Sequence, residues 1–233
     1  MKNFGKWIMF CLLVLAGTGI ADGQYVIKAL PRWMVSSQGI ILVPGSPTKT
    51  FIEREKWGYQ VEAMYRVQYN KPFLAGLYFN EAGLSRYVLE YDNGDQQIRE
   101  KANTRRLEGG IVVGVYPEIN WLLQPYVLGR FGGALFQSSS ILTDQDTKES
   151  IDRISESAKS VPSYGLDIGV HIVPNIWYIR GDVRVGIVRN PSVRYLILNE
   201  DKKGTVQYPI EAFDEHTSAG KWLKVSAGVS FLF

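Results

Sequence analysis

The sequence is poor in the residues that carry redox, thiol and imidazole chemistry. Its single cysteine, Cys11, lies near the N-terminus, and its only histidines are His171 and His216. A chain that loses its N-terminal segment on export would therefore have no thiol, so it would form no disulfide and offer no Cys ligand or nucleophile. This scarcity excludes cysteine-based redox chemistry, and we expect neither a cofactor nor a metal site.

A surplus of charge of one sign is lacking too. The chain has 26 basic and 23 acidic residues, and its first 21 residues contain Lys2 and Lys6, so residues 22–233 carry 24 basic against 23 acidic residues. Such a balance gives no electrostatic case for a nucleic-acid partner.

Long apolar runs are missing as well. The longest, Ile8 to Ala16, is shorter than the roughly 20 residues that a membrane-spanning helix needs. It follows two lysines and precedes small residues, which is the pattern of a secretory signal peptide. We predict a signal peptide at residues 1–21, with cleavage as late as residue 23, and one exported domain at residues 22–233.

What the exported part does contain is strand pattern. Short segments alternate apolar and polar residues with a period of two and are rich in Tyr, Trp, Val and Gly. Eight such segments are predicted strands: Tyr25–Ser36, Trp57–Tyr69, Phe73–Tyr91, Thr104–Tyr116, Trp121–Gln137, Ser163–Val173, Ile176–Arg189 and Lys221–Phe233.

The connections between these strands alternate in length. Tight turns at 70–72, 117–120 and 174–175 alternate with long polar segments at 37–56, 92–103, 138–162 and 190–220. This alternation is typical of outer-membrane barrels, whose periplasmic turns are short and whose extracellular loops are long. The prediction is an all-β, transmembrane, antiparallel up-and-down β-barrel of about eight strands, with both termini in the periplasm.

Periodicity alone does not separate such a barrel from a soluble sandwich, because either can have one apolar face. Two features favour the membrane barrel. Charged residues recur at the centres of the polar faces, as Glu62 and Arg66 do in the second strand. Aromatic residues also stand near strand ends, where a membrane-interface girdle needs them: Trp57, Tyr69, Trp121, Trp177 and Tyr178.

The last strand carries a further pattern. Between Lys221 and Phe233, apolar residues alternate on one face and end on Val229, Phe231 and the terminal Phe233. This tail resembles the signal by which the barrel-assembly machinery recognises outer-membrane proteins. The whole exported chain resembles the small OmpA/OmpX-like barrels and, in its Tyr- and Gly-rich style, the PorT-type proteins. The resemblance implies a Gram-negative outer membrane, with its lipid and the assembly machinery as partners.

An eight-stranded barrel has room inside only for its own side chains. The alternation points eight cations and four anions into this lumen, and buried charges require pairing. We interpret them as a structural salt-bridge plug; the alternative is an anion-accepting pocket or narrow conduit. The predicted set is Lys28, Arg32, Glu62, Arg66, Arg106, Glu108, Arg130, Asp167, Arg180, Asp182, Arg184 and Lys224.

Catalytic residues are not predicted. On a strand, His171 and Asp167 are separated by roughly 13 Å, so they form no local catalytic pair. A lumenal hydrogen-bonded role suits His171 better, and His216 is assigned to a surface loop. The glycines from Gly129 to Gly133 lack the strand-to-helix context of a phosphate-binding loop.

The longer connections suggest structure outside the membrane. Asp92-Asn93-Gly94-Asp95 is a hairpin-turn sequence, and residues 146–159 fit a short loop helix as well as a solvated loop. Val193–Leu198 is predicted to return through Thr205–Tyr208 and to join the 84–107 hairpin in a raised sheet, and protective loops are the alternative.

Taken together, these patterns predict a non-enzymatic outer-membrane barrel that acts as an anchor or interaction component, with a protein partner in the envelope or at an external surface. A narrow small-solute or ion channel is the first alternative. A lipid-modifying outer-membrane enzyme is the second.

Overall fold

The structure, a computed structural model of the chain, describes residues 32–46, 48–50, 52, 54–67, 71–92, 97–116, 122–144, 147, 150–173, 178–198 and 213–233. The predicted signal peptide lies outside these residues. The strands are β1 (Trp33–Pro44), β2 (Lys56–Arg66), β3 (Phe73–Asp92), β4 (Gln97–Val115), β5 (Leu123–Asp144), β6 (Ser150–Ile172), β7 (Ile179–Leu198) and β8 (Phe213–Leu232). A short 3₁₀ helix, η1 (Thr48–Thr50), follows β1. In the described part of the chain, no helix is long and apolar enough to cross a membrane.

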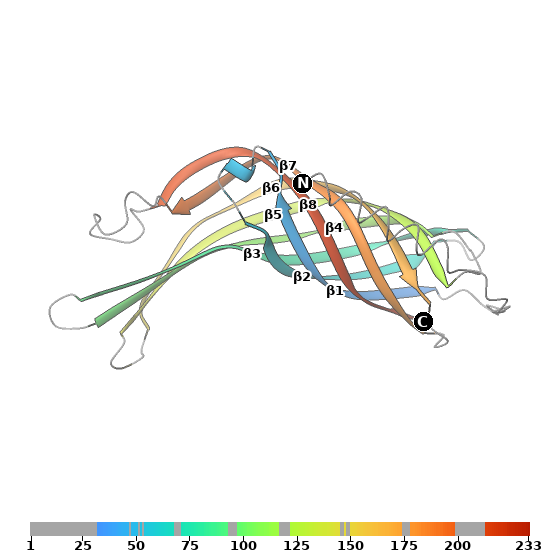
Figure 1. Cartoon of the computed structure of the whole chain (residues 1–233), viewed down its shortest axis with the longest axis horizontal. Helices are drawn as coiled ribbons and strands as arrows, with labels where there is room; N and C mark the ends of the chain where they lie inside the picture. The colour runs from blue at the N-terminus through green and yellow to red at the C-terminus, as the bar shows by residue number, and fades with distance from the viewer. Residues whose placement is uncertain are drawn as a thin grey trace.

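Each strand pairs antiparallel with its neighbour in sequence, and β8 pairs with β1 to close the barrel (Figure 1). The predicted eight-stranded up-and-down β-barrel is confirmed. Closure is completed by the last residue: the Phe233 amide donates to the Trp33 carbonyl at 3.0 Å, and the Arg32 amide donates to the Phe233 carbonyl at 2.8 Å. The described chain therefore enters and leaves the barrel at the same rim.

The bounds of the first predicted strand, Tyr25–Ser36, are wrong: β1 shares only Trp33–Ser36 with it, and residues 25–31 lie outside the described part of the chain. β1 begins at Trp33 and runs to Pro44, because it must pair with β8 from Met34↔Leu232 to Pro44↔Trp222. Most of this strand had been assigned to a loop. Arg32 is consequently exposed just before β1 instead of pointing into the lumen, and Lys28 lies outside the described residues.

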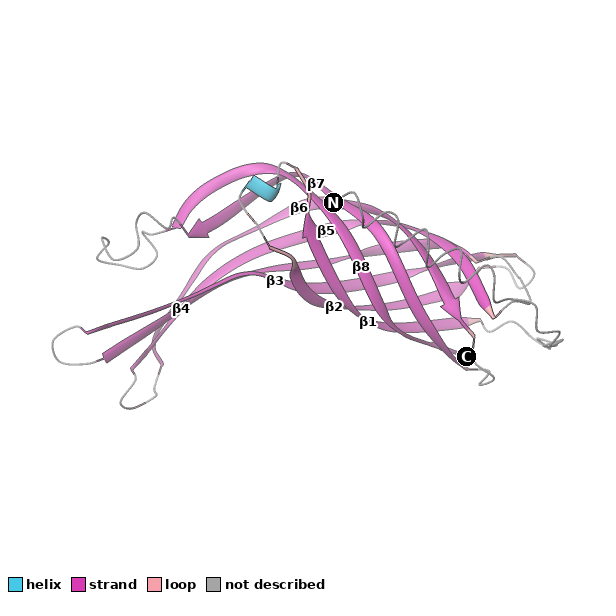
Figure 2. Ribbon diagram, in the orientation of Figure 1, coloured by secondary structure: helices cyan, strands magenta, loops and turns pink. Residues whose placement is uncertain are grey.

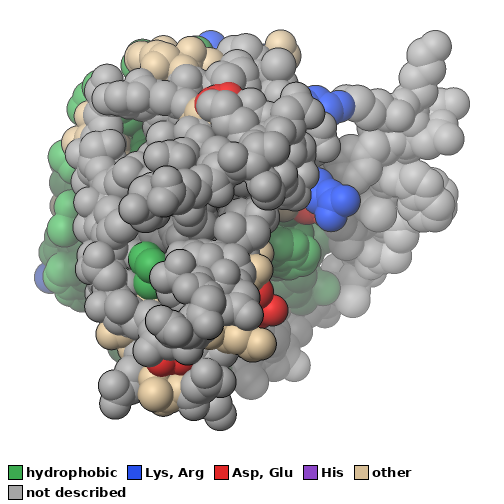
Figure 3. Space-filling model, turned by 90° about the vertical axis from the view of Figure 1, so that its left-hand side faces the viewer, with side chains coloured by type: hydrophobic (Ala, Val, Ile, Leu, Met, Phe, Trp, Pro, Cys, Tyr) green, Lys and Arg blue, Asp and Glu red, His purple; other side chains and the backbone are tan. Residues whose placement is uncertain are grey.

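Polar and apolar side chains are distributed inside out compared with a soluble protein. On β2, Gln60, Glu62 and Met64 are buried in the lumen, while Trp57 and Tyr59 are exposed on the outer wall. The same alternation continues around the barrel, whose exposed wall carries Leu, Val, Ile and Phe side chains. Figure 3, viewed from the loop end, shows hydrophobic side chains along that wall. Such a surface requires an apolar surrounding, which a lipid bilayer supplies.

The aromatic girdle is described in part. Trp57 and Tyr178 are exposed, at 68% and 60%, near opposite rims. Tyr178 stands just before β7, at the rim of the termini, as a residue of the girdle requires. Tyr69, Trp121 and Trp177 lie outside the described residues.

Several strands continue far past the predicted boundaries. β5 extends to Asp144, and β6 begins at Ser150, so most of the predicted 138–162 loop is strand. The loop-helix prediction for 146–159 is wrong, because the backbone from Ser150 onward is taken up by pairing with β5, as in Ile141↔Arg153. A helical pattern in a short polar segment is overridden when a neighbouring strand offers a ladder of hydrogen bonds.

Outside the barrel the strands divide into two groups (Figure 2). β3, β4, β5 and β6 remain paired up to Asp92↔Gln97, Ile98↔Asp144 and Thr143↔Ser150, and they form one four-stranded extension. β7 and β8 continue separately to Leu198↔Phe213. The predicted joining of 193–198 with the 84–107 hairpin is therefore wrong. The strand that returns beside Val193–Leu198 is Phe213–Ser218, and Thr205–Tyr208 lies outside the described residues.

Candidate functional site

The interior of the barrel is stratified into three layers. Toward the rim of the termini lies an apolar cluster of Met34, Met64, Leu74, Tyr78, Val112, Tyr116, Tyr126, Leu128 and Leu232. Toward the loops lies a second one of Ile40, Leu42, Ile52, Ala82, Leu84, Ala134, Phe136, Val161, Val188, Val193 and Trp222. Buried polar and charged side chains stand between them on every strand. We call this middle stratum the charged layer.

At the centre of the charged layer, Arg184 on β7 bridges two carboxylates. Its Nη1 lies 2.5 Å from Glu62 Oε2, and its Nη2 lies 2.5 Å from Asp182 Oδ2. Asp182 also accepts hydrogen bonds from Gln38 Nε2 at 2.6 Å and from the Tyr126 hydroxyl. All three charged side chains have no exposed surface, so each charge depends on these partners for stabilisation.

A second group surrounds Asp167 on β6. Asp167 Oδ2 accepts from Lys224 Nζ at 2.7 Å and from Arg130 Nη2 at 2.6 Å. Arg130 Nη2 also contacts Glu62 Oε1 at 2.7 Å, and its Nη1 donates to Gln60 Oε1 at 2.7 Å. Arg130 thereby joins the Asp167 group to the Arg184 group in one network.

Glu108 on β4 forms the third group. Its Oε2 lies 2.7 Å from both Arg106 Nη2 and Asn80 Nδ2. Its Oε1 accepts from the Tyr78 hydroxyl at 3.0 Å and from the Ser163 hydroxyl. With four donors, this carboxylate is fully satisfied without solvent.

Charge in the charged layer is balanced. The four carboxylates of Glu62, Glu108, Asp167 and Asp182 face four cations: Arg106, Arg130, Arg184 and Lys224. Of the other four predicted cations, Lys28 lies outside the described residues, Arg32 is exposed, and Arg66 and Arg180 stand nearer the rim of the termini. There Arg66 Nη1 donates to the Lys71 carbonyl at 2.8 Å, and Arg180 Nη1 donates to Gln124 Oε1 at 2.8 Å. The cationic surplus expected from the sequence is thus not at the centre of the lumen.

His171 lies in an aromatic stack below the charged layer. Its ring is 5.3 Å from that of Tyr116 and 4.5 Å from that of Tyr126, and its Nε2 is 3.5 Å from Asp182 Oδ2. No serine is described as a partner of its ring nitrogens. The side chain of His216 is not described. Among the residues that the structure describes, no group of three or more His, Cys, Asp or Glu could hold a metal ion.

Of the ten residues of the lumenal set from Glu62 onward, the structure brings eight into the ion pairs of the charged layer, whereas Arg66 and Arg180 lie apart from them. Nine of the ten are buried, and Arg180 is half-buried. Sequence reasoning missed part of the network. Gln38 was assigned to a loop, and Asn80 and Ser163 are neutral residues whose only sequence signal is an inward position on a strand.

A glycine also shapes the site. Gly186 on β7 faces Asp167 on β6, and a Cβ atom there would overlap the Asp167 carboxylate and lie 2.6 Å from the Leu166 carbonyl oxygen. The missing side chain gives Asp167 the space it needs to reach Lys224 and Arg130. A glycine in a strand interior is the usual sequence signal of such a close approach.

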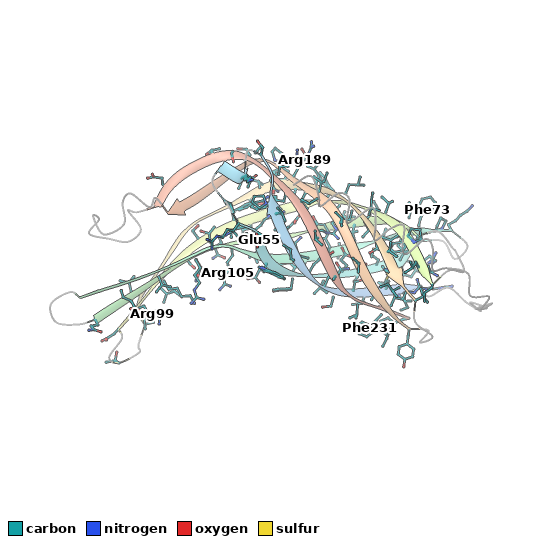
Figure 4. The ribbon with its side chains drawn as sticks, viewed as in Figure 1. Glu55, Phe73, Arg99, Arg105, Arg189 and Phe231 are labelled. Carbon is teal, nitrogen blue, oxygen red and sulfur yellow. The ribbon has the colours of Figure 1, made fainter. Side chains whose placement is uncertain are left out.

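Two other predicted sites lie at opposite ends of the molecule. Val229, Phe231 and Phe233 are exposed on the outer wall near the rim of the termini, at 41%, 38% and 70%. Figure 4 shows Phe231 at this end of the barrel. At the other end Asp92 is the last residue of β3, and Asn93, Gly94 and Asp95 lie outside the described residues. Pairing of Asp92 with Gln97 leaves a short connection there, as a hairpin requires.

No protein-family model matches this chain, and no curated protein matches it significantly. Among solved structures, it is similar to Neisserial surface protein A (11% identity, TM-score 0.41, 86% of this chain and 97% of that chain). It is also similar to the outer membrane protein OprG from Pseudomonas aeruginosa (10%, 0.48, 88% and 97%). A third is Ail, the attachment invasion locus protein of Yersinia pestis, in complex with the heparin analogue sucrose octasulfate (13%, 0.35, 86% and 97%). At these values the likenesses carry no argument about activity, and the barrel assignment rests on the strand pairing described above.

Proposed function

We propose that this protein is a non-enzymatic outer-membrane barrel that anchors a four-stranded β-sheet outside the membrane for binding to another protein. The observation that carries the proposal is the contrast between the two halves of the molecule. The barrel is filled with paired side chains, whereas β3 to β6 continue beyond it as a sheet with free edges.

The height of the apolar wall supports a place in the outer membrane. On β7 the outward residues from Ile179 to Ile187 are apolar or glycine, and eight residues of a strand tilted by about 40° rise about 20 Å. The apolar band of outer-membrane barrels is about 25 Å tall. The eight-stranded barrel fits a small OmpA/OmpX-like barrel, while the PorT-type style rests on sequence alone.

The sheet edges supply the binding surface. β2 pairs with β3 only as far as Gly58↔Ala82, and β6 pairs with β7 only from Tyr164↔Arg189. Within the described residues, the β3 edge from Gly83 to Asp92 and the β6 edge from Ser150 to Ser163 therefore have no neighbouring strand. Free backbone donors and acceptors in such edges are a template for an extended segment of another protein. We assign that role to a strand contributed by an envelope or external protein.

A narrow channel remains the alternative to a pure anchor. The charged layer argues against it, because its cations and carboxylates are matched four to four and the side chains in its ion pairs are at most 2% exposed. A conduit for anions would need unpaired positive charge and water along the bore.

The test is to remove the part of the four-stranded sheet that projects beyond one row of paired residues. Arg86↔Asn103, Asn103↔Ser139 and Ser139↔Ser155 form one row across β3 to β6. Replacing residues 87–102 and 140–154 by two-residue turns would end all four strands at this row. We expect the shortened protein to insert and to show normal heat-modifiable gel mobility, but to lose a partner that cross-links to the native protein in its own membrane.

The matched control shortens the other projecting hairpin. Replacing residues 194–217 by a turn leaves β3 to β6 unchanged and should retain the cross-linked partner. If the partner is retained by the variant without the sheet and lost by the control, the binding surface lies on β7 and β8. If purified native protein forms a steady pore, the channel alternative replaces the anchor.

A further inference from the structure

On the outer wall near the loop rim, two cations stand directly opposite each other. Arg189 on β7 pairs in register with Lys221 on β8, and both side chains are exposed. Like charges facing each other across a ladder are destabilising unless an anion lies between or beside them. Among the described residues, neither has an acidic partner within salt-bridge distance.

A different arrangement holds on the other side of the barrel. There the outward cation near the same rim, Arg105 on β4, lies 3.3 Å from Glu81 on β3, and the Tyr59 hydroxyl donates to the same carboxylate at 2.8 Å. Figure 4 places Arg105 and Arg189 on different sides of the rim, far from Phe73 and Phe231 at the opposite end. Two opposed cations without an acidic partner are thus a feature of β7 and β8 among the described residues.

The position of the pair relative to the apolar wall indicates its ligand. Leu166, Ile187 and Leu223 form a row across β6, β7 and β8, and the next outward row is Tyr164, Arg189 and Lys221. Successive outward residues on a strand are about 7 Å apart. The cations therefore stand one step above the band that faces acyl chains, beside an aromatic residue of the interface type.

A third cation, Lys49, lies in η1, which is attached to β8 at Lys221. η1 is fixed to β8 because the Thr48 hydroxyl accepts from the Lys221 amide at 2.8 Å and donates to the Ala219 carbonyl at 3.3 Å. The next residue, Lys49, is exposed. The Lys221 stem runs toward this side, since its Cγ lies 3.4 Å from where a Cβ of Gly45 would be.

We propose that Arg189 and Lys221, assisted by Lys49, bind the phosphate group of an anionic lipid in the outer leaflet. The phosphate stabilises the opposed cations, and the apolar row beneath them packs against the acyl chains of the same molecule. The inference rests on the membrane placement proposed above and is independent of the partner-binding role of the sheet.

The experiment measures binding of a diphosphorylated glycolipid, lipid A, to the purified protein in neutral detergent. The variant R189Q/K221Q removes both charges, and R99Q/K101Q removes two charges from the projecting sheet as the matched control. We expect affinity to fall about fivefold for each rim charge removed, and about 25-fold for the pair. The control variant should bind as the native protein does, and K49Q should show a smaller loss than the pair.

Two further measurements distinguish binding of the lipid phosphate from binding of free phosphate. Lipid A stripped of its phosphates should bind the native protein and R189Q/K221Q equally, and inorganic phosphate alone should bind neither. Raising the salt concentration should weaken the native affinity for lipid A, an effect that needs no variant to fold. Equal affinity of R189Q/K221Q and R99Q/K101Q would overturn the proposal, as would equal binding of phosphate with and without its lipid. Heat-modifiable gel mobility is measured for every variant. If it is unchanged, the barrel is folded, so a failure of the lipid-binding proposal would leave the proposed anchoring function untouched.

Discussion

The guanidinium group of Arg184 lies 2.5 Å from the Glu62 carboxylate although 122 residues separate them in the chain. Arg184 comes from β7 and Glu62 from β2, and β8 and β1 lie between these strands in the closed sheet. The contact therefore crosses the lumen. It ties distant parts of the wall together, so the charged layer acts as an internal brace as well as a filling.

Removing one member of the Arg184–Glu62 pair should lower the free energy of unfolding substantially. Arg184→Ala leaves Glu62 and Asp182 short of a donor inside the barrel, and the loss of one member of a buried pair typically costs about 3–5 kcal/mol of unfolding free energy. Glu62→Gln should cost less than Arg184→Ala, because its amide can still accept. Urea unfolding in lipid vesicles measures both.

The matched comparison is the exposed pair Arg99–Glu90 on the projecting sheet, at 3.4 Å. Arg99→Ala should change stability by less than about 1 kcal/mol because solvent screens that pair. Similar losses for Arg184→Ala and Arg99→Ala would contradict the bracing role.

Gly186 should be sensitive to the smallest substitution. Gly186→Ala pushes the Asp167 carboxylate away from Lys224 and Arg130, and crowding of this kind costs about 1–3 kcal/mol. The control is Gly83→Ala at the β3 bulge, where an added Cβ meets nothing within 4 Å. Unfolding midpoints of the two variants check the prediction, and a stable Gly186→Ala protein would show that Asp167 can move without loss.

Conductance should remain near baseline for the native protein in planar bilayers. The charged layer is continuous across the bore, and apolar clusters lie above and below it. We expect no steady large pore under either polarity. A stable open level in most insertions would mean that the filled interior rearranges in the bilayer.

Loss of the terminal aromatic residues should prevent assembly. Phe233→Asp together with Phe231→Asp places charges on the outer wall at the seam where β8 joins β1, and it also removes the terminal pattern that resembles an assembly signal. Heat-modifiable protein in the outer-membrane fraction should fall strongly. Phe233→Trp keeps an aromatic ring and should assemble; normal yield of the double Asp variant would disprove the assigned signal.

Much of the site followed from the sequence because strand periodicity is strict. Side chains alternate between the two faces of a strand, so once the register of a strand is set, Glu62 and Asp182 must lie on its inward face. Gln38 was missed for the opposite reason: the segment after Ser36 does not alternate, because Ser37, Gln38 and Gly39 are followed by four consecutive aliphatic residues. Pairing with β2 and β8 places it in a strand.

The sequence by itself determined the strand count and the inward positions of the lumenal charges, because both follow from a two-residue repeat along the chain. It determined the fold class through that repeat together with the alternating loop lengths and the aromatic residues near strand ends. Tertiary structure alone decided which charges meet, as Arg130 meets Glu62 and Asp167 from separate strands, because that depends on how the ladders are staggered when the barrel closes. It likewise decided that β5 and β6 extend the sheet outside the barrel. Hydrogen-bond pairing between neighbouring strands overrides the local preference of a polar segment for loop or helix.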